Sequence, residues 1–169
     1  MLNHSLAVSN RPSIEAFRMP NGWQGAVEPE EPRFPVAHQA LALTPANLRI
    51  LIVNEDTRSA ASLTNVLNEL GYNTTFTASS AHRGLLAAHD FSPSVALVDL
   101  VLPDMSGFQL AQTLRSHIRS HVRRVPLIAV AERDIFGTSD LARAAGFVAC
   151  LCKPVPRIEL NSLLRKLCR

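Results

Sequence analysis

The sequence has 169 residues, 47% of them hydrophobic, and Lys and Arg outnumber Asp and Glu by 17 to 14, for a formal net charge of +3. This length and composition indicate one domain with a packed core that is mainly aliphatic, because aromatic residues make up only 5% of the chain. No apolar stretch approaches the ~18 residues of a membrane span, and no basic start leads into an apolar segment, so we expect no membrane insertion, no signal peptide and a cytoplasmic protein. The small positive charge does not indicate nucleic-acid binding.

The first 46 residues show no hydrophobic periodicity. They contain six prolines, and the acidic, Pro-containing stretch 28–32 is typical of solvated, extended chain. Trp23 and Phe34 stand alone in this region, as anchors for a partner or for the domain itself. We predict a disordered N-terminal tail over residues 1–46 and a folded domain over 47–169.

The folded domain opens with a strand and helix pattern that then recurs. The apolar run 50–53 predicts the first strand. Apolar residues at i, i+3, i+4 and i+7 within 63–70 predict an amphipathic helix, which Asp56 is placed to cap and Gly71 to end. Residues 72–78, rich in Thr and aromatic side chains, predict the second strand.

The middle of the domain repeats this alternation. Ser79 or Ser80 is placed to cap a second helix that runs to about His89. The nearly unbroken apolar run 95–98 is typical of a strand buried on both faces, and it ends at Asp99. A third helix is predicted after the cap residue Ser106. Its core-facing residues are predicted to be Leu110, Leu114 and Ile118.

The last third of the chain completes the pattern. We predict strands over 125–130 and 147–152, a helix from Thr138 to Ala145, and a final helix that Pro156 opens. Five strands alternating with five helices predict an α/β fold: a doubly wound, flavodoxin-like (βα)5 sandwich with a parallel sheet in the order 2-1-3-4-5.

Polar residues follow three of these strands. Asn54, Glu55 and Asp56 follow the first strand, Asp99 the third and Lys153 the fifth. The carboxyl ends of parallel strands converge on one edge of the sheet, where two close carboxylates favour a cation such as Mg²⁺ and a lysine neutralises a phosphoryl group. The arrangement indicates phosphoryl transfer onto a carboxylate.

At this point the sequence resembles the receiver domain of two-component response regulators, over residues 48–169. The resemblance is carried by Ile-Leu-Ile-Val-Asn-Glu at 50–55, Val-Asp-Leu-Val-Leu-Pro-Asp-Met-Ser-Gly at 98–107 and Cys-Lys-Pro at 152–154. The family pattern has the same spacing from Asp99 to Pro103 and to Gly107. It also has the Lys-Pro pair, here at 153–154.

The resemblance implies a phosphoprotein of a phosphorelay, not an enzyme. Asp99 would accept a phosphoryl group from a histidine kinase or a histidine phosphotransfer protein, and Lys153 would bind the phosphoryl oxygens. Mg²⁺ would be held by Glu55, Asp99 and the backbone carbonyl of Val101, with Asn54 contributing weakly or through water.

Three positions depart from the family pattern. Asn54 replaces the first of two acids, which implies weaker Mg²⁺ binding. Ala131 occupies the position of a Ser or Thr whose hydroxyl binds the phosphoryl group, and Cys150 replaces a Tyr or Phe whose rotamer follows phosphorylation. We therefore expect phosphorylation to be poorly coupled to the neighbouring surface. Candidate substitutes for the missing hydroxyl are Arg133, Thr138 and Ser139.

Two weaker patterns do not indicate metal or redox chemistry. His117 and His121 lie four residues apart late in the predicted third helix, but arginines crowd them and would repel a cation. The three cysteines lack the spacing of zinc or redox motifs and are predicted to be buried and reduced. They are Cys150, Cys152 and Cys168.

Three functional hypotheses remain open from the sequence. The first is a stand-alone receiver without an output domain, phosphorylated on Asp99, that acts by protein–protein contact or as a phosphorelay intermediate or sink toward an unidentified target. The second is a pseudo-receiver that binds its partner without phosphorylation, motivated by Asn54 and Ala131. The third is a flavodoxin-like domain that binds an unrelated small ligand at the same strand ends.

Overall fold

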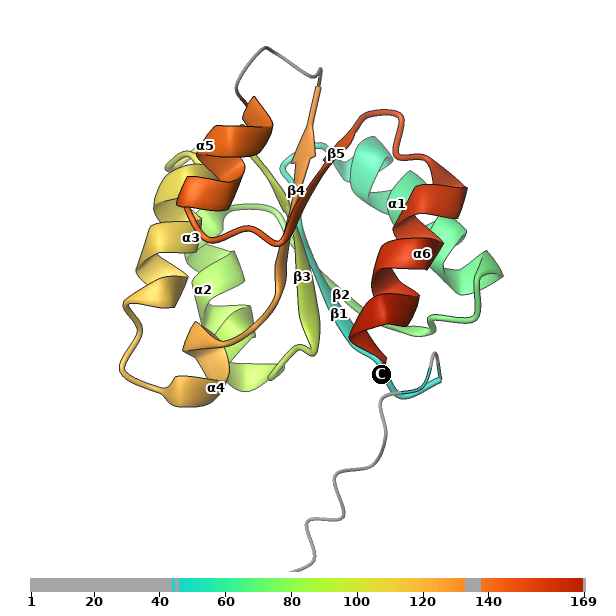
Figure 1. The fold of residues 1–169 in the computed structure, drawn as a ribbon, viewed down its shortest axis with the longest axis horizontal. Helices are drawn as coiled ribbons and strands as arrows, with labels where there is room; N and C mark the ends of the chain where they lie inside the picture. Colours follow the sequence, from blue (N-terminus) through green and yellow to red (C-terminus); the bar gives the residue numbers. More distant parts are fainter. Residues whose placement is uncertain (1–43, 45, 133–137, 169) are drawn as a thin grey trace, which may run out of the picture. The chain divides into compact units, whose positions relative to one another are not determined.

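The computed structural model describes residues 44, 46–132 and 138–168 (Figure 1). Most of the predicted tail, together with Arg133, lies outside the described residues, so its disorder stays a prediction. Among the described residues, none of the helices combines the length and the apolar character that crossing a membrane requires.

Five parallel strands form one sheet in the order β2-β1-β3-β4-β5, as predicted. The strands are β1 (Arg49–Val53), β2 (Thr74–Ala78), β3 (Val95–Asp99), β4 (Leu127–Ala131) and β5 (Ala149–Cys152). The helices are α1 (Thr57–Glu69), α2 (Ala81–Asp90), α3 (Gly107–Arg115), α4 (Ser120–Arg123), α5 (Thr138–Ala144) and α6 (Arg157–Leu167).

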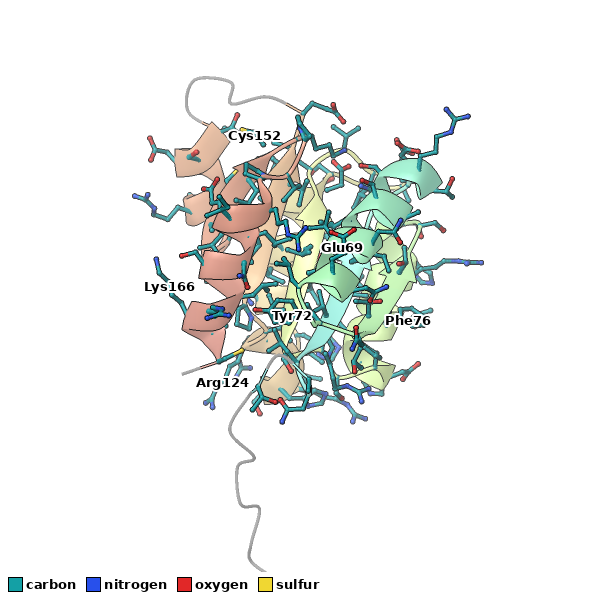
Figure 2. All side chains as sticks on the ribbon, turned by 90° about the vertical axis from the view of Figure 1, so that its right-hand side faces the viewer. Glu69, Tyr72, Phe76, Arg124, Cys152 and Lys166 are labelled. Carbon is teal, nitrogen blue, oxygen red and sulfur yellow. The ribbon has the colours of Figure 1, made fainter. Side chains whose placement is uncertain are left out.

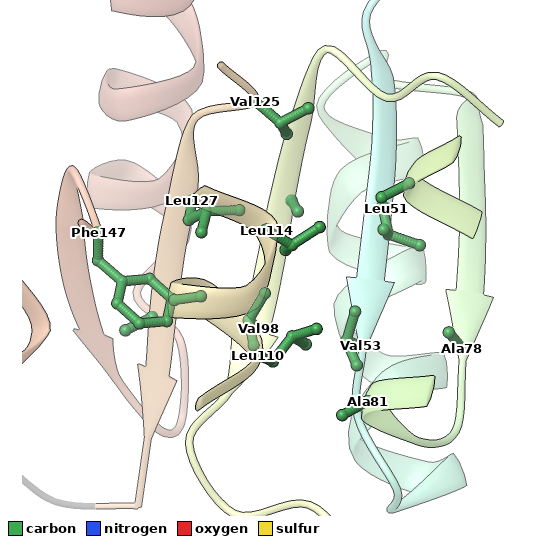
Figure 3. Packing of buried hydrophobic residues seen from close by; sticks show 14 of the residues in the cluster. Leu51, Val53, Ala78, Ala81, Val98, Leu110, Leu114, Val125, Leu127 and Phe147 are labelled. Carbon is green, nitrogen blue, oxygen red and sulfur yellow. The ribbon is translucent and has the colours of Figure 1, made fainter. Parts of the chain in front are cut away.

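The sheet lies between two layers of helices. Helices α1 and α6 cover one face, and α2 to α5 cover the other (Figure 1). All five residues of β3 and of β4 are buried, because these central strands have helices on both faces. One hydrophobic cluster fills the space beneath α2 and α3 and includes Leu51, Val98 and Leu110 (Figure 3). A second cluster packs α1 and α6 against the other face.

The predicted helix caps are confirmed. The Asp56 side chain accepts a hydrogen bond from the backbone N–H of Arg58, and Ser80 rather than Ser79 caps α2. Ser106 forms a capping box with Gln109 at the start of α3. These local hydrogen bonds satisfy backbone donors that the first turn of a helix leaves free.

The predicted extent of the third helix is wrong. Helix α3 ends at Arg115, and Ile118 is 89% exposed instead of facing the core. The short helix α4, which the sequence did not predict, follows. His117 and His121 therefore do not share a helix, so their four-residue spacing does not place them on one helix face.

The side chain of Arg115 stabilises this early end of the helix. Its guanidinium donates hydrogen bonds to the carbonyls of Arg123 at 2.8 Å, Val125 at 2.8 Å and Gly146 at 2.7 Å. Burial lowers the pKa of Arg115 from its ordinary value. These three carbonyls lie outside the strands, and the guanidinium supplies the hydrogen-bond donor that each of them needs.

Three strand boundaries and the burial of the cysteines also differ from the prediction. The strand predicted over 125–130 is β4, which begins two residues late, at Leu127, and ends at Ala131. β2 begins two residues later than predicted, because Tyr72 is buried against α6, where its hydroxyl donates to Asn161 Oδ1 at 3.1 Å (Figure 2). β5 likewise begins two residues late, at Ala149. The cysteines are free thiols, as predicted, but they are only partly buried.

Candidate functional site

The register of the sheet brings the predicted site residues to one rim. Val53 of β1 lies beside Val98 of β3, so Asn54 and Asp99 follow on neighbouring strands. Ala131 of β4 pairs with Cys152 of β5, immediately before Lys153. Figure 2 shows Cys152 and Arg124 at opposite ends of the domain, so the basic α3–α4 region lies away from this rim.

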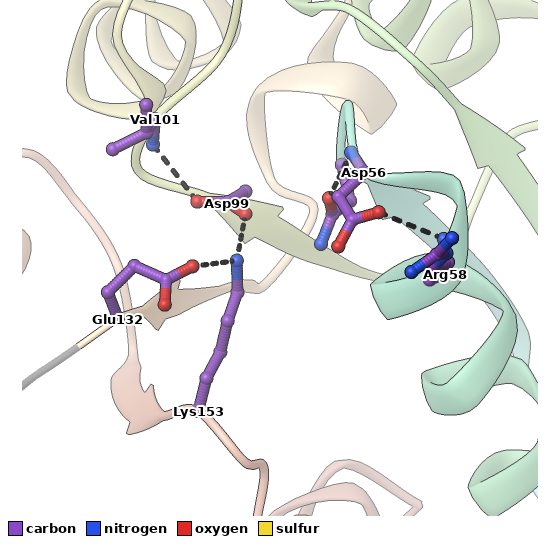
Figure 4. A network of polar contacts seen from close by, with 7 residues as sticks. Asp56, Arg58, Asp99, Val101, Glu132 and Lys153 are labelled. Atoms are coloured by element: carbon purple, nitrogen blue, oxygen red, sulfur yellow. Dashed lines mark hydrogen bonds and ion pairs between the residues drawn. The ribbon is translucent and has the colours of Figure 1, made fainter.

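Asp99 is buried, and both of its carboxylate oxygens accept hydrogen bonds (Figure 4). Oδ1 accepts from the backbone N–H of Val101 at 3.0 Å, and Oδ2 accepts from Lys153 Nζ at 2.5 Å. A carboxylate that is only 4% exposed needs such partners, because burial of an unpaired charge is costly. The ammonium reaches it from the position directly after β5, 54 residues along the chain.

Lys153 contacts a second carboxylate that the sequence analysis did not identify. Its Nζ lies 2.8 Å from Glu132 Oε1, at the end of β4. Burial of the ammonium favours its neutral form, but hydrogen bonds and charge interactions with Asp99 and Glu132 outweigh burial, so the pKa of Lys153 is raised. The sequence did contain a signal for Glu132: its position directly after a predicted strand.

Asn54 is buried and orders the turn between β1 and α1. Its Oδ1 accepts a hydrogen bond from the backbone N–H of Asp56 at 2.8 Å, and Asp56 in turn caps α1. Glu55 between them is exposed to solvent. The amide oxygen of Asn54 is thus already engaged, whereas the Glu55 carboxylate is accessible.

The β3–α3 loop folds closely over the strand end that carries Asp99. A Cβ added to Gly107 would lie 2.3 Å from the Asp99 carbonyl oxygen, so only glycine fits here. The Gly107 backbone N–H donates to the carbonyl of Leu100 at 3.0 Å. The close contact explains the aspartate-to-glycine spacing of the motif in steric terms.

Asp104 ties the same loop to α2, a role that the sequence analysis missed. Its two carboxylate oxygens accept hydrogen bonds from the backbone N–H groups of Ala81 at 2.9 Å and His82 at 2.8 Å. The hydrogen bond from His82 is the main cause that lowers the pKa of Asp104. Asp104 lies 23 residues after Ala81, so the partner of these free helix donors could not be read from the local sequence around α2.

The ends of β1 and β3 carry oxygen atoms of the kind that Mg²⁺ prefers, with two carboxylates among them. Asp99 and Glu55 would supply the carboxylates and Val101 a backbone carbonyl, and these are hard oxygen ligands. No group of three or more His, Cys, Asp or Glu side chains in the described part of the chain is arranged to hold a metal. Asn54 adds no charge to these donors, and its amide oxygen already accepts the Asp56 N–H.

Of the two remaining departures, Ala131 borders an open space and Cys150 packs against the hydrophobic core. Ala131 and Thr138 line a cavity of about 410 Å³ that also includes Asp99 and Leu141. Ala131 is buried and offers only a methyl group there, and Cys150 is half-buried against the hydrophobic cluster. Thr138 is therefore near the site, whereas Ser139 is exposed on α5.

Comparisons with known proteins agree with this geometry. Residues 50–165 match the family model of the response regulator receiver domain. Protein RcaC of Microchaete diplosiphon is 30% identical over 122 residues, which is 72% of this chain but only 18% of RcaC. The chain thus spans a small part of that relative.

Two solved structures are similar over most of their length. A CheY-like receiver domain protein from Methanospirillum hungatei is 31% identical with a TM-score of 0.60, covering 71% of this chain and 93% of the other. The receiver domain of the sensor histidine kinase PA1611 from Pseudomonas aeruginosa, which has a magnesium ion coordinated in its active site cleft, is 25% identical with a TM-score of 0.64 and covers 72% and 97%.

The family match argues against the third hypothesis, an unrelated ligand-binding flavodoxin-like domain. It also indicates what the rim does in receiver domains in general. Receiver domains are phosphorylated by histidine kinases or phosphotransfer proteins, bind Mg²⁺ in the active site and are generally not enzymes. The fold, the buried Asp99–Lys153 pair and the match over residues 50–165 together show that the chain belongs to the response regulator receiver domains of two-component systems.

Proposed function

We propose that Asp99 is the phosphoacceptor of this receiver domain and that Lys153 binds the phosphoryl oxygens. The observation that carries the proposal is the contact of 2.5 Å between the Lys153 ammonium and the buried Asp99 carboxylate at the carboxyl ends of β3 and β5. A buried nucleophilic carboxylate beside a cation is suited to receive a group with negative charge.

The transfer requires positioning more than acid–base catalysis. A carboxylate oxygen of Asp99 attacks the phosphorus, and the bond from phosphorus to the imidazole nitrogen of the donor breaks, leaving its electron pair on that nitrogen. The Lys153 ammonium then neutralises charge on the phosphoryl oxygens. Glu55, Asp99 and the Val101 carbonyl would hold Mg²⁺, with Asn54 acting through water, and the bound ion would neutralise further phosphoryl charge.

The output of the domain is proposed to be a phosphorelay role or contact with a partner protein. Ala131 has no hydroxyl to draw the β4–α5 connection toward the phosphoryl group, and Cys150 has no aromatic ring to follow such a movement. Phosphorylation then leaves the α5 surface largely unchanged. A phosphate intermediate or sink fits these features better than a conformational switch.

The test is direct phosphorylation by a small donor. We expect incubation with Mg²⁺ and acetyl phosphate to add the mass of one phosphoryl group, measured by intact-protein mass spectrometry. Asp99→Asn should abolish the gain, and omission of Mg²⁺ should strongly reduce it. A folded wild-type protein that gains no mass would reject the proposal.

A phosphorylation-independent binding module is the second candidate. It is favoured by the engaged amide of Asn54 and by the occupation of Lys153 by two carboxylates. Partner affinity that is unchanged in both Asp99→Asn and Lys153→Ala would support this function, and a large loss in both would argue against it.

A further inference from the structure

Glu132 occupies a position that the proposed chemistry does not use. It follows the last residue of β4, and the backbone N–H of Lys153 donates to the adjacent Ala131 carbonyl at 2.7 Å. This hydrogen bond holds the two strand ends together, so the Glu132 carboxylate reaches Lys153 Nζ at 2.8 Å. Lys153 thereby bridges Asp99 and Glu132 (Figure 4).

The two carboxylates on Lys153 have different surroundings. The Asp99 side chain is 5% exposed, whereas the Glu132 side chain is 72% exposed. Asp99 has two hydrogen-bond partners, Lys153 and the Val101 N–H. In the described part of the chain, the Glu132 side chain has one, Lys153. Of the two, Glu132 is the one that can leave, because its carboxylate regains hydration when it turns outward.

Glu132 also stands between two cavities. It lines the cavity of about 410 Å³ on the Asp99 side, with Val101 and Thr138, and the cavity of about 630 Å³ beside α1, with Asn54 and Lys153. Among the described residues, it is the one that lines both. Its carboxylate thus lies where a group approaching Asp99 and Lys153 must pass or settle.

Charge makes Glu132 a competitor of a phosphoryl group. Since both carboxylates contact the same Nζ, they lie within about 5 Å of each other, a range in which like charges oppose one another. A phosphoryl group on Asp99 carries roughly −1.5 to −2 charges at pH 7 and seeks the same ammonium. Glu132 and the phosphoryl group therefore cannot both be well accommodated.

We propose that Glu132 is a specificity-determining residue of the phosphoryl site: its carboxylate holds Lys153 in the unmodified protein and must be displaced before a phosphoryl group or another tetrahedral oxyanion can bind there. This inference rests on the proposed function of Asp99. In this role Glu132 restrains anion binding, because its carboxylate competes with the phosphoryl group for the Lys153 ammonium.

The experiment measures beryllofluoride, a non-covalent phosphoryl mimic, bound in the presence of Mg²⁺, by ¹H–¹⁵N chemical shifts and ¹⁹F NMR. Glu132→Gln keeps the shape of the side chain and removes its charge. We expect this variant to bind about three- to tenfold more tightly than wild type. Glu159→Gln, an exposed acid in the first turn of α6, removes the same charge elsewhere and should leave the affinity unchanged.

The outcomes separate this inference from the proposed function. Binding that persists in Asp99→Asn would reject the role of Asp99. Binding that requires Asp99 but is equal or weaker in Glu132→Gln would overturn the restraining role and leave the phosphoacceptor intact. Binding seen only in Glu132→Gln would support the inference strongly, and no binding by any folded variant would overturn both.

Discussion

Lys153 is the residue on which the proposed site depends, because its ammonium contacts Asp99 and it approaches that carboxylate from the end of another strand, β5. The arrangement is held by backbone contacts as much as by charge. The Val101 N–H fixes one oxygen of Asp99, and the Ala131 carbonyl fixes the backbone of Lys153. The side chains are therefore pre-positioned before any ligand arrives.

Lys153→Met tests this dependence. It keeps an aliphatic chain but leaves Asp99 without its ammonium and a phosphoryl group without its counter-charge. We expect the rate of phosphorylation by acetyl phosphate to fall at least about tenfold, which corresponds to about 1.4 kcal/mol. Intact-mass time courses measure the rate, and Lys166→Met on α6 serves as the control. An unchanged rate would contradict the assigned role of Lys153.

Gly107 gives a second prediction at the residue scale. In Gly107→Ala the new methyl group would meet the Asp99 carbonyl oxygen, so the loop must shift. We expect a loss of about 1–3 kcal/mol in the free energy of unfolding, measured by urea denaturation. Gly71→Ala is the control: its φ of +88° is costly for alanine, but nothing lies within 4 Å. A larger loss in Gly71→Ala would argue against the steric reason.

At the scale of the elements, the connections are held by side chains that bond to backbone of distant segments. Arg115 joins the end of α3 to the segments that precede β4 and β5. Asp104 joins the β3–α3 loop to the first turn of α2. Neither contact follows from helix or strand periodicity, because each partner lies in another element.

Arg115→Met should destabilise the fold by about 2–3 kcal/mol, because three carbonyl groups lose their donor. Chemical denaturation measures the loss, and hydrogen exchange should rise first in α4. Arg119→Met, which removes an exposed guanidinium nearby, is the matched control and should be close to neutral. Similar losses in both variants would point to general charge effects instead.

Asp104→Asn should change the dependence of stability on pH. The pKa of Asp104 is lowered from its ordinary value of 3.8, so its contribution is present above that value and is lost as the pH falls through the lower folded-state value. The stability difference between wild type and variant should therefore be full near about pH 6 and shrink toward about pH 3. A difference that stays constant with pH would contradict the capping role of the charge.

At the scale of the whole molecule, the proposed phosphoryl site and α5 border the same cavity, but the side chains that would couple them differ from the family pattern. Asp99 lies at the rim on one side of this cavity, Thr138 and Leu141 of α5 line it as well, and Ala131 is the β4 residue that lines it. With no hydroxyl at residue 131 and no aromatic ring at residue 150, there is little to transmit a change between them.

We accordingly expect phosphorylation or beryllofluoride binding to shift amide resonances near Asn54, Asp99 and Lys153, with small shifts over α5 (Thr138–Ala144). The double variant Ala131→Thr, Cys150→Tyr should enlarge the α5 shifts, because it supplies the hydroxyl and the ring. Large α5 shifts in the wild-type protein would show that another route couples the two regions.

Much of this protein could be predicted from its sequence. Hydrophobic periodicity located the strands and most helices, because burial on one or both faces imposes a fixed spacing. Motif spacing placed Asn54, Asp99 and Lys153 after strands β1, β3 and β5, and the order of a parallel sheet brought them to one rim. The error at Ile118 arose because its apolar spacing continued the helical pattern after the helix had ended at Arg115.

The sequence by itself determined the fold class, the order of the sheet and the strand ends where the site lies, because periodicity and caps are local properties of the chain. Only the tertiary structure decided that Arg115 ends α3, that Asp104 caps α2 and that Glu132 shares Lys153 with Asp99. Each of these contacts joins residues far apart in the chain, and their distances exist only after packing has brought the elements together.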